Sequence, residues 1–258
     1  MAPSASMDNL FDGELFARKL SQFTRLGPTD RQALTMLSGD RVRRVRARDD
    51  LIRENERPTG VKLMLSGWAS RYKIIEDGRR QIMAFLVPGD ICDLNVFILR
   101  DMDHSVGALT TVTFADIARE TIEFVMDEFP RVAQALLWDQ LVAHSIQREW
   151  TINLGRRSAF ERIAHLLCEL FLRLRGVGLA DGQSCGMPLT QADLADATGL
   201  SAVHVNRTLQ ELRSQNLIVL RGRELVVPDF EALQQVAGFN RNYLHLDREG
   251  RHLDANDV

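Results

Sequence analysis

The alternation of apolar and polar residues changes character along this chain. Residues 41–117 contain short runs rich in Val, Ile, Thr and Phe, separated by turn sequences that contain Gly and Pro. Short strands at this spacing favour a small barrel or jelly roll over a βαβ arrangement. Before them, Pro28 predicts the start of a helix that runs to Leu37, with Thr29 or Asp30 as its cap.

A single helical pattern follows Pro130 and continues for roughly 25 residues. A helix of this length cannot bury its whole surface within one small domain, so it predicts a coiled-coil-like seam between two copies of the chain. A helix packed only against its own barrel is the alternative. A polar stripe runs along the helix, and it is either a solvated face or a weak part of the seam. The dimer interface is expected at Leu136, Gln140, Ala143, His144, Gln147 and Thr151.

One stretch near the C-terminal end carries most of the functional information. Thr190 precedes a short helix and has an acidic residue three positions later, as in a capping box. Ala195 is small enough for a second helix to cross closely, Gly199 allows a turn with positive φ, and Val205 supplies an aliphatic side chain for the second helix to bury. This spacing predicts a helix-turn-helix, with an ordinary helical pair as the alternative.

A tight hairpin follows at Leu217–Val227, with Arg221 and Arg223 at its tip. It is typical of the wing of a winged helix, whose cations lie against phosphates. The two features together predict binding to double-stranded DNA. The contacts are expected from Thr190, Gln191, Ser201, Ala202, Val203, His204, Asn206, Arg207, Arg213, Arg221 and Arg223.

The charge of the chain qualifies this prediction. The formal net charge is −3, whereas proteins that bind nucleic acid are usually basic. Between Leu200 and Arg223, however, four arginines and one glutamate leave a local charge of +3. The predicted basic surface is therefore small and lies on the second helix and the hairpin.

A β-rich N-terminal half, a long connecting helix and a C-terminal winged helix resemble the CRP/FNR family of bacterial transcription regulators. The resemblance covers residues 20–235 and is strongest at Thr190–Ile218, while Gly67-Trp68-Ala69-Ser70 through Pro88-Gly89-Asp90 resembles the family's sensor barrel. It implies an α+β fold: an N-terminal β jelly-roll sensor of the cyclic-nucleotide-binding type, a long dimerisation helix and a C-terminal winged helix-turn-helix. It also implies a homodimer that binds a two-fold-symmetric promoter site and contacts RNA polymerase.

With this resemblance, the chain is expected to divide into a flexible N-terminus (1–19), a sensor (20–128), a dimerisation helix (129–156), a DNA-binding domain (157–236) and a C-terminal tail (237–258). The start of the chain has no basic segment followed by an apolar stretch, so no signal peptide is expected. The longest apolar run, Ile82–Val87, is too short to span a membrane. A cytoplasmic protein without membrane contact is expected.

The sensor departs from the family's cyclic-nucleotide cassette, in which Gly-Glu and a later Arg-Ser-Ala hold the ribose and the phosphate. The matching positions are Gly89-Asp90 and His104-Ser105-Val106. A neutral His104 cannot make the two-pronged contact of arginine with phosphate. Arg100 is four positions out of register, and it keeps cyclic AMP open as an alternative to an unknown effector. Effector contacts are expected among Gly89, Asp90, Ile91, Arg100, His104, Ser105, Gln147 and Arg148.

Other cofactors and activities find little support in the residue pattern. The three cysteines (Cys92, Cys168 and Cys185) predict a reducing compartment, and they cannot supply the four thiolates of an iron–sulfur cluster. Haem ligation by Cys92 or His104 stays open as an alternative. No cofactor is assigned from the sequence, and no metal site is expected. No catalytic residue is expected, because the chain has neither a Gly-rich phosphate loop nor a recognisable nucleophile. A cyclic-nucleotide-binding signalling module that acts through protein contacts is the alternative function.

Overall fold

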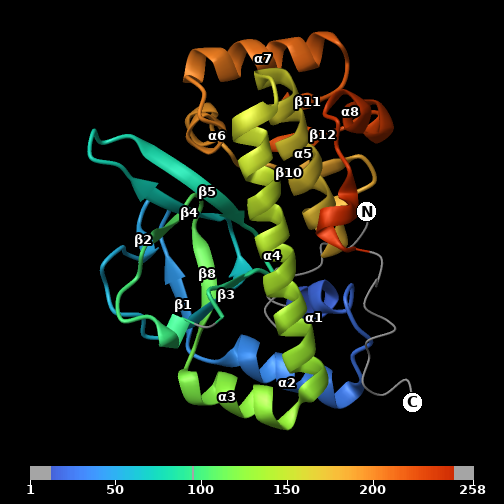
Figure 1. The fold of residues 1–258 in the computed structure, drawn as a ribbon. Helices are drawn as coiled ribbons and strands as arrows, with labels where there is room; N and C mark the ends of the chain where they lie inside the picture. Colours follow the sequence, from blue (N-terminus) through green and yellow to red (C-terminus); the bar gives the residue numbers. More distant parts are fainter. Residues whose placement is uncertain (1–12, 95, 247–258) are drawn as a thin grey trace. The chain divides into compact units, whose positions relative to one another are not determined.

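The computed structural model describes residues 13–94 and 96–246. The chain divides into two compact units. Of the described residues, the first contains residues 13–69, 86–94 and 96–140, and the second contains residues 70–85 and 141–246. Residues 1–12 of the expected flexible N-terminus and residues 247–258 of the expected tail lie outside the described residues. The mixture of helices and strands confirms the predicted α+β class (Figure 1).

The first unit begins with two helices, α1 (Glu14–Leu20) and α2 (Pro28–Gly39). Helix α1 corrects the expectation of a flexible segment up to residue 19, because it buries Leu15 and Phe16 in the core. The predicted cap of α2 is also wrong. Gly27 is the N-cap, and its backbone N–H donates to Asp30 Oδ2 at 2.8 Å. Pro28 fits the first helical position because that position needs no N–H donor.

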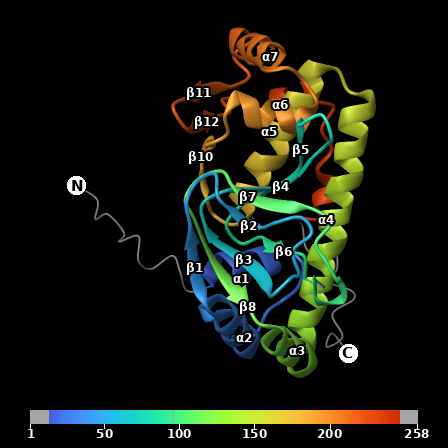
Figure 2. The same cartoon turned by 90° about the vertical axis from the view of Figure 1, so that its left-hand side faces the viewer.

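The described strands of the first unit form the predicted β-roll (Figure 2). They are β1 (Val42–Val45), β2 (Asp50–Ile52), β3 (Val61–Ser66), β6 (Ile91–Cys92), β7 (Ser105–Ala108) and β8 (Val112–Ile117). One sheet has the order β1-β8-β3-β6, and β2 pairs antiparallel with β7. Gly67 turns the chain after β3 at φ +82°, where an added Cβ would lie 2.2 Å from the Thr111 carbonyl oxygen.

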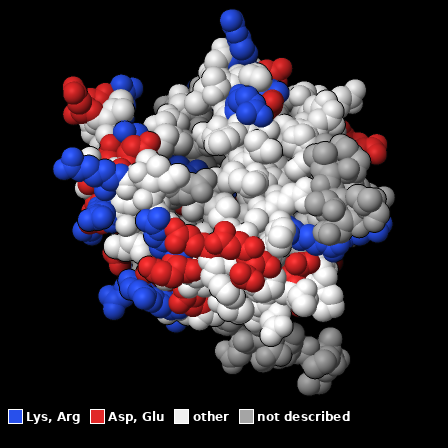
Figure 3. Space-filling view, turned by 60° about the horizontal axis from the view of Figure 1, so that its bottom comes forward, with Lys and Arg blue, Asp and Glu red and all other residues white. Residues whose placement is uncertain are grey.

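The first unit also contains a short 3₁₀ helix, η2 (Val96–Ile98), and the helix α3 (Arg119–Glu128). Helix α3 buries Ile122 and Val125 and exposes four carboxylates, at Glu120, Glu123, Asp127 and Glu128. Figure 3 shows acidic side chains gathered on the face where α3 lies. Much of the negative charge that sets the net charge of the chain is therefore on the first unit.

The predicted long helix is α4 (Pro130–Arg156), which has 27 residues and passes from the first unit into the second. Helix α5 (Ala159–Gly176) follows, and Ser158 and Glu161 form a capping box at its start. Figure 1 shows α4 and α5 side by side, with α6 (Gln191–Thr198) and α7 (Ala202–Ser214) at the end where they join.

The hairpin of β4 (Ala69–Ile74) and β5 (Arg80–Leu86) lies within the residues expected for the sensor, and its residues 70–85 cluster with the second unit. Hydrogen bonds and ring packing explain this. Gln147 Nε2 of α4 donates to the Met83 carbonyl at 2.7 Å, and an Nη2 of Arg173 donates to the Phe85 carbonyl at 2.9 Å. The ring of Phe85 also packs edge-on against that of Trp150.

The second unit ends in a small sheet of order β11-β12-β10-β9. Its strands are β11 (Val219–Arg221), β12 (Glu224–Val226), β10 (Ser184–Gly186) and β9 (Ala180–Asp181). Two strands that precede α6 in the chain, β9 and β10, thus extend the sheet of the wing. Helix α8 (Phe230–Val236) and the 3₁₀ helix η3 (Arg241–Leu244) follow.

The part of the expected tail that is described, residues 237–246, is not separate from the second unit. The rings of Phe239 and Tyr243 lie 4.8 Å and 5.8 Å from the ring of His165 in α5, measured between centroids. The Tyr243 hydroxyl donates to Glu169 Oε2 at 3.1 Å. The aromatic side chains hold this segment against α5 because their rings are more favourably placed in the core than in water.

Candidate nucleic-acid interface

The helix-turn-helix forms at the residues that predicted it. Thr190 is the N-cap of α6, and its Oγ1 accepts the Asp193 N–H at 3.1 Å while Asp193 Oδ2 accepts the Thr190 N–H at 3.0 Å. Gly199 ends α6 in the left-handed conformation, with φ at +66°. Ser201 then caps α7 by accepting the His204 N–H. The two caps satisfy backbone donors that would otherwise have no partner.

The predicted packing of the two helices is confirmed. Ala195 of α6 is buried, and Val205, Leu209 and Leu212 of α7 are buried as well. Because these three positions face the interior of the second unit, the opposite face of α7 remains in contact with solvent.

This exposed face carries a hollow of about 530 Å³. Its lining mixes apolar and hydrogen-bonding side chains. The lining residues are Gln191, Ala202, Val203, Asn206, Arg207 and Gln210. Five of them were predicted from the sequence. Gln210 was missed, although it follows Arg207 by three positions and therefore shares its helix face.

Arg207 is exposed, and its side chain makes no hydrogen bond or ion pair with any described residue. Thr190, Ser201, Ala202 and His204 are also exposed, at the N-terminal ends of α6 and α7. Arg213 differs from these. It lies in the last turn of α7, is only partly exposed, and has a buried Nε with no hydrogen-bond partner among the described residues.

The wing presents the other two predicted arginines. Arg221 ends β11, Arg223 precedes β12, and Gly222 between them has φ at +62°. Both arginine side chains are exposed and have no partner in the part of the chain that the structure describes. Their guanidinium groups are free to bind an anion from outside the chain.

Two further arginines, not predicted from the sequence, position α6. Arg80 of the β4–β5 hairpin donates from Nε to Asp196 Oδ2 at 2.7 Å and from Nη2 to Asp193 Oδ1 at 2.9 Å. Burial disfavours its charge, but Asp196 and Asp193 outweigh that effect and raise its pKa. Asp193 is therefore held from two sides, by the Thr190 cap and by Arg80. No local sequence signal links residues so far apart.

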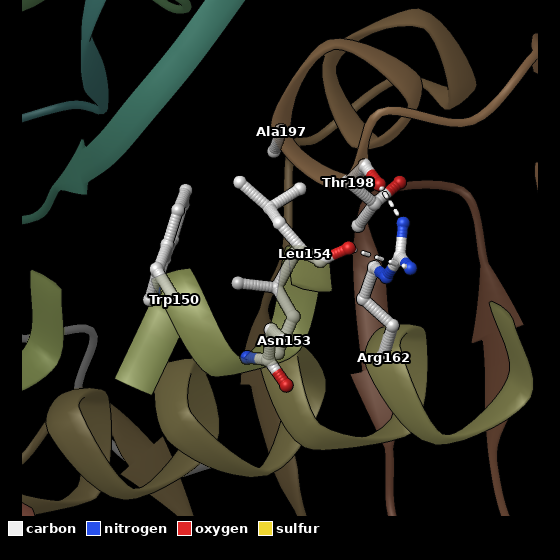
Figure 4. A pocket seen from close by; sticks show the side chains of 7 residues that line it. Trp150, Asn153, Leu154, Arg162, Ala197 and Thr198 are labelled. Carbon is white, nitrogen blue, oxygen red and sulfur yellow. Dashed lines mark hydrogen bonds between the residues drawn. The ribbon is translucent and has the colours of Figure 1, made fainter. Parts of the chain in front are cut away.

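Arg162 of α5 is the second positioning arginine, as Figure 4 shows. Its guanidinium donates to the carbonyls of Thr198, Leu154 and Arg157, at 2.5, 3.2 and 2.9 Å. It thus joins the end of α4 to the end of α6. The cavity beside it is only about 10 Å³ and can hold one water at most. The joint between the long helix and the helix-turn-helix is closely packed.

Asp90, one of the expected effector residues of the sensor, forms hydrogen bonds and an ion pair within the chain. Asp90 is 4% exposed, and its Oδ2 accepts the Val87 N–H at 2.7 Å. Its Oδ1 accepts from Lys19 Nζ at 2.9 Å, and Lys19 Nζ also lies 2.7 Å from Asp139 Oδ1. Burial disfavours the charged lysine, but Asp139 and Asp90 outweigh burial and raise its pKa. Gly89 and the buried Ile91 flank Asp90 in this turn.

His104 is nearly buried between two carboxylates. Its Nδ1 lies 2.6 Å from Asp103 Oδ1 and its Nε2 lies 3.1 Å from Asp93 Oδ2. The neighbouring Ser105 Oγ accepts the Glu54 N–H at 2.9 Å. Arg100 does not join this group: its side chain is 96% exposed and lies beside Asp101.

Two residues of α4 that were named as effector contacts, Gln147 and Arg148, form hydrogen bonds within the chain. Gln147, named for both the effector site and the dimer interface, donates to the Met83 carbonyl, and Arg148 donates from Nη2 to Ser145 Oγ at 2.6 Å. Leu136 is 0% exposed because it packs inside the first unit, so it is not on the surface where the interface was expected. Gln140 and Ala143 are partly exposed, and His144 and Thr151 are exposed.

The cysteines Cys92, Cys168 and Cys185 are free and buried. Burial raises the pKa of the Cys185 thiol to about 12, and Glu224 adds to this. Among the described residues, no group of three or more His, Cys, Asp or Glu side chains could hold a metal ion. None of the described helices is long and apolar enough to cross a membrane.

Two family models match the chain. Residues 161–236 match the Crp-like helix-turn-helix domain, and residues 42–129 match the cyclic nucleotide-binding domain. The first match contains α6, α7 and the wing, and the second contains the strands of the β-roll.

Curated relatives and a solved structure agree with these matches. The transcriptional activator protein FnrL of Cereibacter sphaeroides is 32% identical over 69% of this chain and 73% of its own length. The nitrogen fixation regulation protein FixK of Bradyrhizobium diazoefficiens is 29% identical over 65% of this chain and 69% of its own length. The structure of FixK2 from Bradyrhizobium japonicum superposes with a TM-score of 0.68 at 26% identity, covering 76% of this chain and 96% of that one.

Proposed function

Since the chain belongs to the CRP/FNR family of DNA-binding transcription regulators, we propose that it binds promoter DNA sequence-specifically as a homodimer. Its DNA affinity is set by a signal at the sensor, and that signal is not cyclic AMP. It acts in the cytoplasm, contacts RNA polymerase at the promoter and catalyses no reaction.

The observation that carries this proposal is the hollow on α7. Its hydrogen-bonding side chains are exposed, and the wing of the same unit carries two exposed arginines without partners among the described residues. An α-helix that exposes such a face fits the major groove of DNA. Arg207 is the candidate for paired hydrogen bonds to guanine O6 and N7. Arg221 and Arg223 are the candidates for phosphate contacts, which position the protein without reading sequence.

The homodimer is supported by an apolar stripe on α4. Leu137, Leu141 and Ile152 are 52%, 60% and 47% exposed, and their spacing places them on one side of the helix. His144 lies on the same side. This stripe replaces Leu136 as the apolar part of the proposed interface, and His144 keeps the polar character that was expected there. Two chains joined along α4 would present two copies of α7 to DNA, which matches a two-fold-symmetric site.

The polar contacts of the sensor argue against a cyclic nucleotide. Asp90 is already paired with Lys19, and both ring nitrogens of His104 face carboxylates. A cyclic phosphate placed there would meet Asp93 and Asp103 rather than a guanidinium group, and like charges repel. Arg100 would have to leave solvent and move to supply the missing contact. A different effector, or a signal that changes these internal pairs, fits the sensor better.

The test is selection of DNA from a random pool of duplexes by the full-length protein at low salt. We expect enrichment of a two-fold-symmetric sequence whose half-sites are centred about 10 base pairs apart, or a multiple of that spacing. Addition of cyclic AMP is expected to leave the affinity for this DNA unchanged. Absence of any enriched sequence would favour a module that acts through protein contacts, and a rise in affinity with cyclic AMP would overturn the effector part.

A further inference from the structure

A hydrogen bond joins the two helices of the helix-turn-helix on their exposed side. Asn206 Nδ2 of α7 donates to Gln191 Oε1 of α6 at 3.2 Å. Both side chains are exposed, and both line the hollow. The bond makes no contribution to the core, so its effect is on the orientation of the two amides at the surface where DNA would bind.

The position of Gln191 is itself well determined. It is the first residue of α6, directly after the Thr190 cap. The cap is completed by Asp193, whose other oxygen accepts from Arg80. The backbone at the start of α6 is therefore held by two sets of hydrogen bonds, and the Gln191 side chain offers an acceptor to Asn206 from this position.

The bond to Gln191 leaves Asn206 with a specific set of free groups. An Asn amide has two N–H donors and one carbonyl acceptor. One donor is used by Gln191, so one donor and the carbonyl acceptor remain for another partner. Adenine presents an acceptor at N7 beside a donor at N6 in the major groove, and the paired contact of Asn with these atoms is a specific one.

We propose that Asn206 reads an adenine in each half-site and that Gln191 is the positioning residue that orients its amide. This inference rests on the proposed function. It adds adenine as the base that Asn206 recognises, and it gives Gln191 a positioning role without base contact. Arg207 is next to Asn206 in sequence, so the adenine read by Asn206 and the guanine read by Arg207 lie close together in the half-site. Val203, 71% exposed one turn earlier, is available to a thymine methyl group.

Gln210 provides an internal comparison. It carries the same amide and lines the same hollow, but its side chain has no hydrogen-bond partner among the described residues. Without such a partner it must lose its rotamer freedom when DNA binds, which weakens discrimination. Asn206 is therefore assigned as the adenine reader in preference to Gln210.

The experiment compares DNA selected from the random pool by the full-length wild type and by three variants. Asn206→Ala and Asn206→Asp remove the donor to N7, and the aspartate keeps the size of the side chain. Both are expected to lose preference for adenine at one position of each half-site by about 5- to 100-fold, with the guanine preference retained. Gln191→Leu is expected to reduce the same preference by about 2- to 10-fold, because the amide is no longer held.

Gln215→Leu is the matched control, since Gln215 is an exposed glutamine at the C-cap of α7 outside the hollow. It should select the same sequence as the wild type, and thermal unfolding should be unchanged in every variant. A wild type that enriches no sequence would contradict the proposed function itself. A wild type that enriches a sequence whose adenine preference does not respond to Asn206→Ala would overturn the adenine reader. An unchanged preference in Gln191→Leu would overturn the positioning role.

Discussion

Asp90 and His104 of the sensor have partners within the same unit, whereas Arg207 of α7 and the two wing arginines have none among the described residues. In the sensor, Asp90 and His104 are nearly buried and bonded to other groups of the same unit. On α7 and the wing, Arg207, Arg221 and Arg223 are exposed, and no described residue pairs with them. Polar side chains are thus used inside the chain in one region and left for an outside partner in the other.

This difference indicates which region is ready to bind a ligand as it stands. A polar group with an internal partner must break that contact before it can bind something else, and the broken contact subtracts from the affinity. The exposed arginines have no such contact to lose. The proposed DNA-binding surface therefore has no internal contact of these arginines to break, whereas a ligand of the sensor has to compete with Lys19, Asp93 and Asp103.

Removal of Lys19 should break the internal pairing of the sensor most strongly. Lys19→Met leaves Asp90 and Asp139 buried without their cation, and we expect the free energy of unfolding to fall by about 3–5 kcal/mol. Arg18→Met is the control, because Arg18 is the adjacent cation and pairs with Glu14 in solvent. That variant should change stability by less than about 1 kcal/mol. Urea unfolding of both proteins measures the difference, and equal losses would contradict the internal role of Lys19.

Arg207→Ala should reduce base discrimination by the exposed face of α7. If Arg207 makes paired hydrogen bonds to a guanine, its loss costs about 1–3 kcal/mol of discrimination at one base position. Binding to duplexes that differ only at that position measures the effect. Arg213→Ala is the variant to compare in the same binding measurement, because Arg213 is partly buried in the last turn of α7, whereas Arg207 is exposed. Retention of full discrimination in Arg207→Ala would show that another residue reads the guanine.

The buried His165 provides a pH-dependent test of internal packing in the second unit. Burial lowers its pKa to about 3 in the folded chain, and Arg157 adds to this. The unfolded chain has an ordinary histidine with pKa near ~6.5, so below that pH the unfolded state binds a proton that the folded state does not. This contribution to stability is complete above pH ~6.5 and declines towards pH ~3, by up to about 1.4 kcal/mol per pH unit.

Urea unfolding between pH 7 and pH 5 measures this dependence. His165→Gln removes the titrating ring and should flatten the profile, whereas His204→Gln, at an exposed histidine of α7, should leave the slope of the wild type. A slope in His165→Gln as steep as that of the wild type would assign the pH dependence to other groups.

The smallest expected effect concerns the wing. Arg221→Ala and Arg223→Ala should weaken binding to all sequences alike, and each should reduce the slope of log affinity against log salt by about 1. Titrations at several salt concentrations, with specific and with random DNA, measure both quantities. A loss confined to the specific DNA would mean that the wing reads bases.

The helix-turn-helix could be predicted almost completely from the sequence, because its signals are local. Thr190 and Asp193 lie three residues apart, Gly199 ends the first helix, and Val205 begins the buried side of the second. The α2 cap shows the limit of such reasoning: Gly27 has no side chain to mark it as a cap, so Thr29 and Asp30 were preferred. Helix α1 was missed because its burial depends on packing that a seven-residue pattern does not reveal.

The sequence by itself determined the class of the fold, the long helix and the helix-turn-helix, since periodicity, caps and turns act over a few residues. Only the tertiary structure decided how distant residues pair. Lys19 meets Asp90 across 71 positions, Arg80 meets Asp193 across 113, and Asn206 meets Gln191 across 15. Such pairs form when packing brings their elements together, and nothing in the neighbourhood of either residue specifies the partner. The same packing buried Leu136 and left Leu137 and Leu141 exposed, a difference of one position that the spacing of apolar residues could not resolve.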